Sequence, residues 1–409
     1  MSREARVKIE PAASPVAVRG FRFCGVHGGI KKKGRRDFAL IVADRPCAAA
    51  AVFTQNRCAA APVVVSRDHI KDGQLQAVMI NSGNANCATG EQGLKLARWS
   101  CDELASRLGI APTLVIPCST GVIGVPLDHR VMARAISVGV DSLSKRGFGA
   151  AARAIMTSDA FPKWAERKVN VDGVEIHVTA MAKGAGMIEP HMATLLAFVL
   201  TDAKMSPACA GAMLKDGVAK SFNRISVDGD TSTNDTCLLM ASGEVAGVPI
   251  DGPDSPGYAA VAAAVAAVLD ETARMVVRDG EGATKMVDLT ITGAASDDEA
   301  DRAARRIINS PLVRCAITGA DPNWGRLVMA LGNTDATFDL GALEVRVGNV
   351  ALVHAGVVIS EDAVVAARRA MKADAYEIAI KLGDGPGAAT VITSDLTTEY
   401  VVFNSAYTS

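Results

Sequence analysis

A threonine follows a glycine-rich segment in the middle of this chain and directly precedes an apolar run. The segment reads LysGlyAlaGlyMetIleGluProHisMetAlaThrLeuLeuAlaPhe from Lys183 to Phe198. Cleavage of the Ala193–Thr194 peptide bond would make Thr194 a new N-terminus, whose α-amine can act as the base for its own hydroxyl. We therefore predict that the chain cuts itself between Ala193 and Thr194 and that Thr194 is a nucleophile.

The residues before Thr194 are compatible with this chemistry. Gly184 and Gly186 let the chain turn sharply, and strain at the cleavage point favours attack of the Thr194 hydroxyl on the Ala193 carbonyl. Lys183, eleven residues before Thr194, could hold a substrate carboxylate, although a surface lysine is the commoner outcome. A threonine before a strand is also ordinary, because β-branched residues favour strands.

Two polar clusters directly follow strand candidates. Asn81–Gly90 precedes a helix and is either a helix cap or part of a substrate pocket; the sequence leaves these about even. In Pro117–Gly124, the Thr120 hydroxyl and the Gly121 N–H could stabilise the oxyanion of an acyl transfer, although spacing alone slightly favours a plain β-turn. One such cluster carries little weight, but several in one chain favour a composite site.

Two more clusters have competing interpretations. In Met156–Lys163, the residues Thr157, Ser158 and Asp159 could cap a helix or offer hydroxyls to a polar substrate. The acidic residues of Ser221–Thr236 do not have the spacing of a calcium loop, because the glycine comes too early and no glutamate stands at the twelfth position. We expect a hydrogen-bonded structural loop there and no metal site.

The last two clusters lie near the C-terminal end. Glu281 is flanked by two glycines within Arg278–Lys285 and could bind an ammonium group or transfer a proton, or could lie in an exposed turn. Asn404–Ser409 is either a frayed chain end or, with a strand before it, a segment tied into a site.

Composition excludes several classes of protein. The 409 residues have a net charge of −1, and no aromatic-interleaved basic stretch is present, so nucleic acid is an unexpected partner. The basic run Lys31–Arg36 is expected in a solvated loop. Nine cysteines without paired spacing indicate a reduced, intracellular protein with thiols in its core and no zinc site. The longest apolar run, Tyr258–Leu269, is too short to span a bilayer, so we expect a cytoplasmic protein.

Short apolar runs alternate with helical patterns, which predicts an α/β fold of two or three packed units. A hairpin is expected over Val169–Met181, with its turn at Asp172 and Gly173. The polar loop Val248–Pro256 is a candidate connection between units. The expected strands are Phe38–Val42, Ala77–Ile80, Thr113–Ile116, Leu195–Leu200, Met286–Thr292, Tyr376–Ile380 and Thr390–Thr393; the expected helices are Glu91–Leu108, His129–Val138, Pro207–Phe222, Ala259–Val277, Asp297–Ile308 and Asp362–Lys372.

Taken together and in order, these motifs resemble those of the ArgJ family, the glutamate N-acetyltransferases or ornithine acetyltransferases of the cyclic arginine pathway. The resemblance covers nearly the whole chain. It runs from AlaValPheThrGlnAsnArg (Ala51–Arg57) through the clusters above and AlaAspProAsnTrpGlyArg (Ala320–Arg326) to AsnSerAlaTyrThrSer at the end.

The resemblance implies a multilayer α/β, self-processing fold, similar in logic to N-terminal-nucleophile enzymes, with an α chain of residues 1–193 and a β chain of residues 194–409. It implies that Thr194 carries the acetyl group between N-acetylornithine and glutamate, with Thr120 and Gly121 as oxyanion donors. An α₂β₂ heterotetramer is the usual assembly, no cofactor is implied, and acetyl-CoA is a further donor in some members. The implied substrate contacts are Thr157, Lys183, Thr194, Glu281, Asn404 and Ser409.

Two residues depart from the family pattern. His191 stands where the family often has asparagine, three residues before the cut, and could influence the cleavage rate or its pH dependence. Ala160 replaces a hydroxyl-bearing residue and could remove one polar contact. The alternatives are a self-processing amidohydrolase or aminopeptidase with water as acceptor, and a non-enzymatic small-molecule binding protein on the same scaffold.

Overall fold

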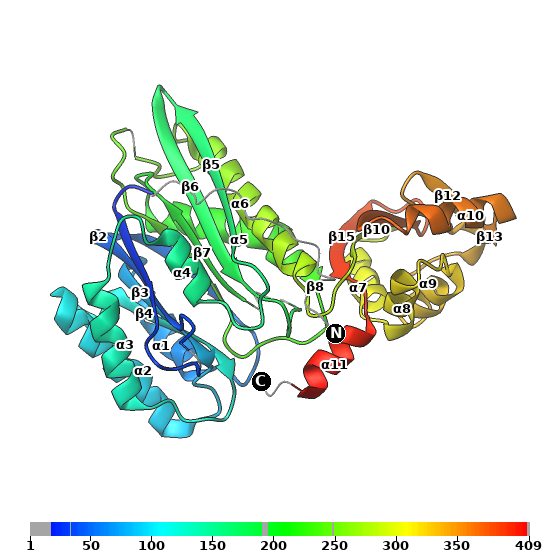
Figure 1. The fold of residues 1–409 in the computed structure, drawn as a ribbon. Coiled ribbons are helices and arrows are strands. Elements are labelled where there is room, and N and C mark those ends of the chain that lie inside the picture. Colours follow the sequence, from blue (N-terminus) through cyan, green and yellow to red (C-terminus); the bar gives the residue numbers. More distant parts are fainter. Residues whose placement is uncertain (1–17, 33, 190–194, 248, 407–409) are drawn as a thin grey trace. The chain divides into compact units, whose positions relative to one another are not determined.

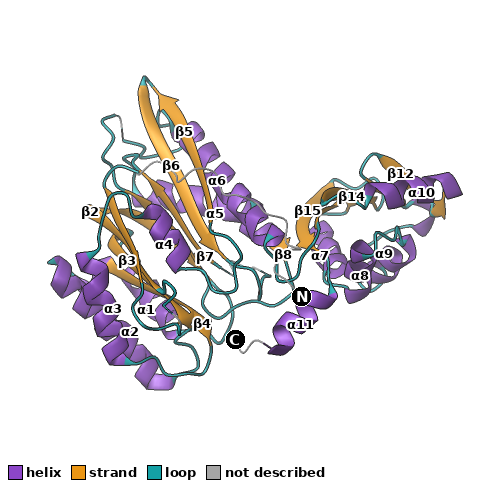
Figure 2. Cartoon of the chain, in the orientation of Figure 1, coloured by secondary structure: helices purple, strands orange, loops and turns teal. Residues whose placement is uncertain are grey.

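The computed structural model describes residues 18–32, 34–189, 195–247 and 249–406. These residues form two compact units, each built around its own sheet (Figure 1). The larger unit holds described residues up to Asn223 and Thr231–Val276. The smaller unit holds Arg224–Asp230 and the described residues from Val277 onward. The expected α/β class is confirmed (Figure 2).

The larger unit is built on an eight-stranded sheet within the described residues. Its strands follow the order β4-β3-β2-β9-β7-β6-β5, and β1 pairs with β2. The strands are β1 (Phe21–Val26), β2 (Phe38–Phe53), β3 (Gln74–Asn84), β4 (Val115–Val122), β5 (Lys163–Val171), β6 (Val174–Lys183), β7 (Leu196–Thr201) and β9 (Thr236–Ala241). Its α-helices are α1 (Ala61–His69), α2 (Gly90–Leu108), α3 (His129–Asp141), α4 (Phe148–Ala154), α5 (Pro207–Lys220) and most of α6 (Tyr258–Arg278).

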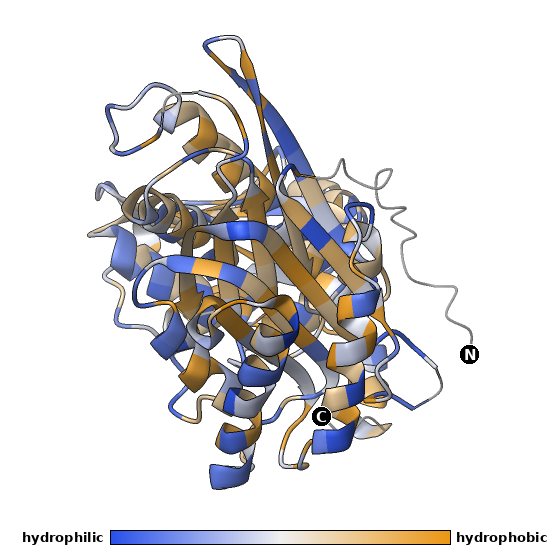
Figure 3. Cartoon of the chain, turned by 90° about the vertical axis from the view of Figure 1, so that its left-hand side faces the viewer, coloured by the Kyte–Doolittle hydropathy of each residue, from blue (hydrophilic) through white to orange (hydrophobic). Residues whose placement is uncertain are grey.

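Helices cover both faces of this sheet, and the alternation of side chains along β2 shows why. Phe38, Leu40 and Val42 pack in one apolar cluster with residues of α2 and α3. Ala39 and Ile41 point the other way, into a cluster that includes residues of α4. A strand buried on both faces must be apolar at every position, as β2 is over this stretch. Figure 3 shows apolar residues concentrated along these strands.

The expected hairpin is confirmed as β5 and β6. The two strands pair in antiparallel register from Lys163↔Ala182 to Val171↔Val174. Asp172 and Gly173 form the turn with φ angles of 49° and 84°, the left-handed conformation that a two-residue hairpin turn requires.

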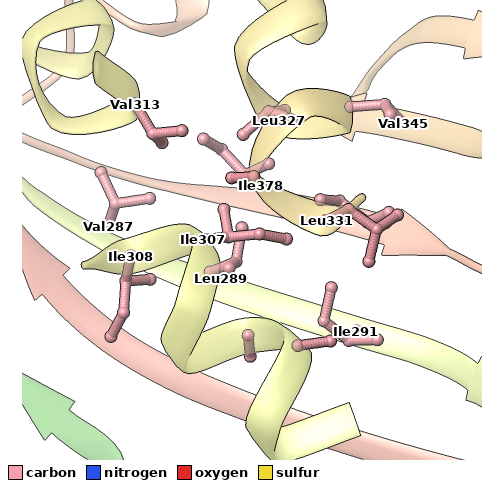
Figure 4. Packing of buried hydrophobic residues seen from close by; sticks show 14 of the residues in the cluster. Val287, Leu289, Ile291, Ile307, Ile308, Val313, Leu327, Leu331, Val345 and Ile378 are labelled. Carbon is pink, nitrogen blue, oxygen red and sulfur yellow. The ribbon is translucent and has the colours of Figure 1, made fainter. Parts of the chain in front are cut away.

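The smaller unit contains a seven-stranded sheet within the described residues, in the order β13-β12-β11-β14-β10-β15-β8. Figure 4 shows its aliphatic core, where α7 (Asp297–Ile308), α8 (Pro311–Thr318) and α9 (Trp324–Leu331) pack on the sheet. The other elements are β8 (Ile225–Ser226), β10 (Met286–Ala294), β11 (Glu344–Val347), β12 (Val350–His354), β13 (Val357–Val358), α10 (Glu361–Ala370), β14 (Ala375–Lys381), β15 (Gly387–Ser394) and α11 (Thr398–Ala406).

The structure differs from the expected fold at several points. Residues 249–256 lie inside the larger unit, so the loop predicted to connect units does not do so; the division falls between Val276 and Val277, within α6. The segment before the C-terminal end is the helix α11, which was not predicted, while the last expected strand, Thr390–Thr393, is confirmed within β15. Helices α1, α4, α8, α9 and α11 and strands β1, β8, β9 and β11–β13 were not predicted, chiefly because short elements carry little periodicity.

The predicted cut falls between two neighbouring strands of the larger sheet. Strands β6 and β7 pair in antiparallel register from Val178↔Thr201 to Lys183↔Leu196. The twelve residues between them include 190–194, which lie outside the described residues. Across the part of the chain that the structure describes, no helix is long and apolar enough to cross a membrane.

Candidate active site

Thr120 and Gly121 lie within a strand. They were expected in a turn after it, and that expectation is wrong because β4 extends to Val122 and pairs with β3 through Gly83↔Gly121. Gly121 has a φ of 133°, and a Cβ atom there would lie 2.3 Å from the carbonyl carbon of Gly83. Only glycine fits this close approach of two backbones.

Lys183 is the last residue of β6 and is 8% exposed, so the expectation of a surface lysine is wrong. Its Nζ donates a hydrogen bond of 3.2 Å to the Thr120 Oγ1. The structure thus brings together two residues predicted for the site that are 63 positions apart in sequence.

Asp159 organises the residues around Lys183. Its Oδ1 accepts hydrogen bonds from the Lys163 Nζ and from the Gly184 N–H, both at 2.7 Å. Its Oδ2 accepts from the Thr157 N–H at 2.8 Å. The side chains of Asp159 and Lys163 are both fully buried. This carboxylate therefore ties the Thr157 loop to the start of the glycine-rich segment.

The protonation of Asp159 follows from its neighbours. Burial raises the pKa of a carboxyl group, but the ammonium groups of Lys163 and Lys183 and the hydrogen bonds from Lys163 and Thr157 outweigh it. The pKa of Asp159 is therefore held well below its usual range, and the group is a carboxylate. Thr157 and Asp159 follow α4 and do not begin a helix, so the expected helix cap is wrong.

The Ser221–Thr236 cluster is confirmed as a hydrogen-bonded loop, and it holds both flanks of the predicted cut. Thr231 forms an isolated β-bridge with Ile188, and its hydroxyl donates to the Glu189 carbonyl at 2.7 Å. On the other side, the Thr236 N–H donates to the Leu195 carbonyl at 2.9 Å. Among the described residues, no cluster of potential metal ligands is present.

Ala193 and Thr194, the predicted cleavage site and nucleophile, lie outside the described residues, as do His191 and Ser409. Their predicted roles stay predictions. Glu189 and Leu195 are buried and hydrogen-bonded, so the described residues on both sides of the segment that contains Thr194 are anchored in the larger unit.

The asparagines of the Asn81–Gly90 cluster hold the backbone. The Asn81 Nδ2 donates to the Asn84 carbonyl, the Asn84 Nδ2 to the Val125 carbonyl, and the Asn86 Nδ2 to the Gly93 carbonyl. These bonds favour a structural role for the three side chains over lining a pocket. The strand β3 extends to Asn84, so the first four residues of the cluster belong to the sheet.

Glu281 and Asn404 contact each other in the smaller unit. The Asn404 Nδ2 donates a 3.0 Å hydrogen bond to the Glu281 Oε2. Glu281 is 6% exposed, so the expectation of an exposed turn is wrong. Gly282 has a φ of 72°, and its carbonyl accepts a hydrogen bond from Thr397, which fixes the turn.

Cysteine chemistry is not expected at this site. All nine cysteines are free thiols, and seven of them are buried, as predicted for a reduced core. Burial raises the pKa of the Cys118 thiol to about 12 although a hydrogen bond with Thr236 lowers it. A thiol so far from its thiolate form is not a nucleophile at neutral pH.

The model of the ArgJ family matches residues 22–409. "Arginine biosynthesis bifunctional protein ArgJ" of Geobacter sulfurreducens is 43% identical over 390 residues, covering 95% of this chain and 99% of the relative. The protein with the same name in Symbiobacterium thermophilum is 44% identical, covering 97% of this chain and 98% of the relative.

Two solved structures are also similar. The Bacillus halodurans arginine biosynthesis bifunctional protein ArgJ is 37% identical, with a TM-score of 0.42 over 44% of this chain and 95% of that chain. The Mycobacterium tuberculosis ornithine acetyltransferase, complexed with ornithine, is 34% identical, with a TM-score of 0.39 over 44% of this chain and 95% of that chain. TM-scores this low do not establish a common arrangement of elements.

The fold is that of a two-sheet α/β protein whose larger unit holds a buried, lysine-rich polar site. From the family model and the identity to full-length relatives, the chain belongs to the ArgJ family.

Proposed function

We propose that this protein is an acetyltransferase of arginine biosynthesis that moves an acetyl group from N-acetylornithine to glutamate. Family membership supports the reaction, since the relatives are named for arginine biosynthesis and one solved member is an ornithine acetyltransferase with bound ornithine. The structural observation that carries it is the hydrogen bond from Lys183 to Thr120, beside the buried Asp159.

The proposed reaction has two acyl-transfer steps. The Thr194 hydroxyl attacks the acetyl carbonyl of N-acetylornithine while the Thr194 α-amine accepts its proton. Collapse of the tetrahedral intermediate breaks the C–N bond, and ornithine leaves with that proton. The glutamate amine then attacks the acetyl-Thr194 ester and loses a proton. N-acetylglutamate is released, and the Thr194 hydroxyl is restored.

Thr120 and Gly121 suit the role of oxyanion donors. A hydroxyl offers one proton and two acceptor lone pairs. Since the Thr120 Oγ1 accepts from the Lys183 ammonium, its own proton remains available for a developing oxyanion. The nearby positive charge makes the hydroxyl a better donor. Each such donor contributes roughly 3–4 kcal/mol to transition-state stabilisation.

The substrate contacts follow the same chemistry. We propose that Lys183 binds the α-carboxylate that both substrates share, and that Thr157 lies in the same pocket because Asp159 ties its N–H to Gly184. Glu281, oriented by Asn404, is suited to an ammonium group. Ser409 completes the proposed set of substrate-binding residues.

The sheet order explains how the two chains can stay together after cleavage. Strands β7 and β9, which follow the cut, lie between β2 and β6, which precede it. Twelve strand positions join the two chains, six between β2 and β9 and six between β6 and β7. We therefore propose that the processed chains remain one folded body, that they assemble as an α₂β₂ heterotetramer, and that the enzyme is cytoplasmic.

Intact-mass measurement before and after addition of N-acetylornithine tests the proposal. We expect two chains, of which the second begins at Thr194, and one added acetyl group on that second chain. Thr194→Ala should give an uncleaved chain without the acetyl group, while Thr113→Ala, a change at an exposed threonine, should behave as the wild type. Cleaved Thr194→Ala, or an acetyl group elsewhere, would contradict the assignment.

The reaction products separate transfer from hydrolysis. With N-acetylornithine and glutamate, an acetyltransferase forms N-acetylglutamate, whereas an amidohydrolase forms acetate at a rate independent of glutamate. Because the relatives are named bifunctional, acetyl-CoA is the second donor to assay.

A further inference from the structure

We propose that Lys31 is a second carboxylate-binding residue of the site, which holds a carboxylate of the glutamate acceptor alongside Lys183. The proposal rests on the function proposed above and adds a residue to it. Lys31 belongs to the basic run expected in a solvated loop. Lys32 and residues 34–36 are exposed as expected, but Lys31 is not.

A buried carboxylate fixes the loop that carries Lys31. Asp37 is fully buried, and its side chain accepts hydrogen bonds from the N–H groups of Gly28, Gly29 and Lys31. The Asp37 carbonyl accepts from the Ser82 N–H at 2.8 Å, which joins the loop to β3. The backbone of Lys31 is therefore held next to the strand that pairs with Thr120 and Gly121.

The side chain of Lys31 runs across β3 towards the site. A Cβ atom on Gly83 would lie 2.8 Å from the Lys31 Cγ and 3.7 Å from its Cε, so the stem passes directly over Gly83. Gly83 is the register partner of Gly121. The Lys31 Nζ reaches the Met156 carbonyl at 2.5 Å, one residue before Thr157.

The ammonium of Lys31 retains the capacity to bind a ligand. It donates to the carbonyls of Met156 and Arg36, at 2.5 and 3.1 Å. An ammonium has three N–H donors, so these two bonds leave one. The two carbonyl groups carry no net charge, so they do not neutralise the ammonium. A substrate carboxylate would accept the third N–H bond and also neutralise the charge.

The charges around the pocket are unequal. Among the described groups that act on Lys31 or Asp159, the ammonium groups of Lys31, Lys163 and Lys183 outnumber the carboxylates of Asp37 and Asp159, and the Arg35 guanidinium adds a further positive charge. Burial lowers the pKa of Lys31 to about 8, against the opposing effect of the carboxylates. The charged groups that act on it are Asp37 and Asp159, which raise its pKa, and Lys183 and Arg35, which lower it.

The two substrates differ in the number of carboxylates they carry. N-acetylornithine has one, whereas glutamate has two. Lys183, which is hydrogen-bonded to Thr120, is the residue proposed to bind the α-carboxylate that both substrates share. A second ammonium in the same charge cluster has a partner when the acceptor is a dicarboxylate. We therefore expect Lys31 to contribute more to the binding of glutamate than to the binding of ornithine.

Equilibrium binding of each substrate alone tests this without turnover. Calorimetry with glutamate and with ornithine would compare the wild type with Lys31→Met and with Lys32→Met, a control at an exposed lysine of the same loop. Lys31→Met should weaken glutamate binding about tenfold or more, as expected for loss of a charge-assisted bond, and ornithine binding less. Lys32→Met should leave both unchanged.

The pH dependence of binding separates a binding role from a structural one. Wild-type affinity for glutamate should be highest well below pH 8 and fall as the pH rises through about 8, because Lys31 loses its proton there. Lys31→Arg should retain affinity at higher pH, since a guanidinium stays charged. Identical profiles for the two proteins would mean that Lys31 only supports the loop.

The outcomes are distinct from those that test the acetyl transfer. Unchanged glutamate affinity in Lys31→Met overturns the Lys31 proposal even if the wild type transfers acetyl groups. An equal loss for both ligands assigns Lys31 to the shared α-carboxylate and overturns its assignment to the acceptor. Failure of wild-type acetyl transfer, with selective loss of glutamate binding in Lys31→Met, overturns the proposed reaction and leaves the binding role intact.

Discussion

Both units bury charged side chains, but they neutralise them differently. In the smaller unit the Asp395 carboxylate accepts from the N–H groups of Thr284 and Lys285 and from the Thr284 hydroxyl. Arg314, 5% exposed, donates to the carbonyls of Ser394 and Asp395 and to the Ser394 hydroxyl. In both cases the bonds go mainly to the backbone of neighbouring segments.

In the larger unit Asp37 is likewise held by backbone N–H groups, but at the candidate site buried charges also contact one another. Asp159 pairs with Lys163 at 2.7 Å, and Lys183 donates to the Thr120 hydroxyl. Among the described groups that act on Lys31 and Asp159, ammonium groups outnumber carboxylates. Charges bound to backbone groups stabilise the fold, whereas a surplus of one sign in a buried pocket favours a ligand of the opposite sign. The following substitutions test this distinction, in order of decreasing effect.

Asp159→Asn should have the largest effect on stability. It removes the carboxylate that pairs with the fully buried Lys163, and breaking a buried ion pair costs about 3–5 kcal/mol. Denaturant unfolding measures the loss. Asp44→Asn, at a half-exposed surface ion pair with Arg22, is the control and should cost less than about 1 kcal/mol. A small loss for Asp159→Asn would show that Lys163 finds another partner.

Thr120→Val should reduce kcat by roughly a hundredfold or more, because it removes the hydroxyl proposed as an oxyanion donor. Steady-state kinetics with N-acetylornithine and glutamate measures it. The matched variant in the smaller unit is Thr284→Val, which removes the hydroxyl bond to Asp395. It should lower stability by about 1 kcal/mol and leave kcat near the wild-type value. The reverse pattern would remove the distinction between the two regions.

Lys183→Met should raise KM for both substrates by about tenfold or more, because it removes the cation proposed to bind the shared α-carboxylate. Lys204→Met, at an exposed lysine, is the control. An increase in KM for one substrate alone would show that the two α-carboxylates bind at different places.

Asp395→Asn should destabilise the protein by about 1–3 kcal/mol without changing KM, because it weakens bonds to backbone groups and leaves one amide poorly matched. Unfolding measurements on one preparation check the loss of stability, and kinetic measurements on the same preparation check that KM is unchanged. A raised KM would mean that the Asp395 region also acts on the substrates.

Lowering the pH should destabilise the wild type because Asp159 becomes protonated. The pKa of this carboxyl is held below its usual range, so its contribution to stability is present above about pH 4, the value for an unfolded chain, and is lost as the pH falls further. Unfolding free energies measured from pH 5 downwards should fall more steeply for the wild type than for Asp159→Asn. Equal slopes would contradict the assigned ionisation.

The long amphipathic helices were predictable from the sequence alone. The expected helix Asp297–Ile308 has these bounds in the structure, because Ser296 caps it and its apolar residues recur with helical period. The strand β9 was missed because its first residue, Thr236, ends a polar cluster that reads as a loop. Short helices such as α9 read as apolar runs, which periodicity cannot assign.

Some residues of the candidate site could also be predicted from the sequence, and others could not. Thr194, Thr120, Lys183 and Glu281 stand out in the sequence because reactive or polar residues interrupt glycine-rich segments. Asp159 was noted there as a helix cap, and its bonds to Lys163 and Gly184 could not be expected from spacing. In the run Lys31–Arg36 the sequence cannot show which lysine turns inward, because Asp37 and Gly83 decide it through contacts between separate segments.

The sequence by itself therefore determined the reaction chemistry to expect, the α/β class and the family, because these depend on residue types, local periodicity and the order of motifs. Only the tertiary structure decided that Lys183 is buried against Thr120, that Asp159 is held as a carboxylate, and that β7 and β9 lie between strands from the other side of the predicted cut. Burial and contacts between distant segments set the protonation of Asp159, the orientation of Lys183 and the pairing of strands on both sides of the predicted cut. These properties depend on the three-dimensional packing of residues that lie far apart in the sequence.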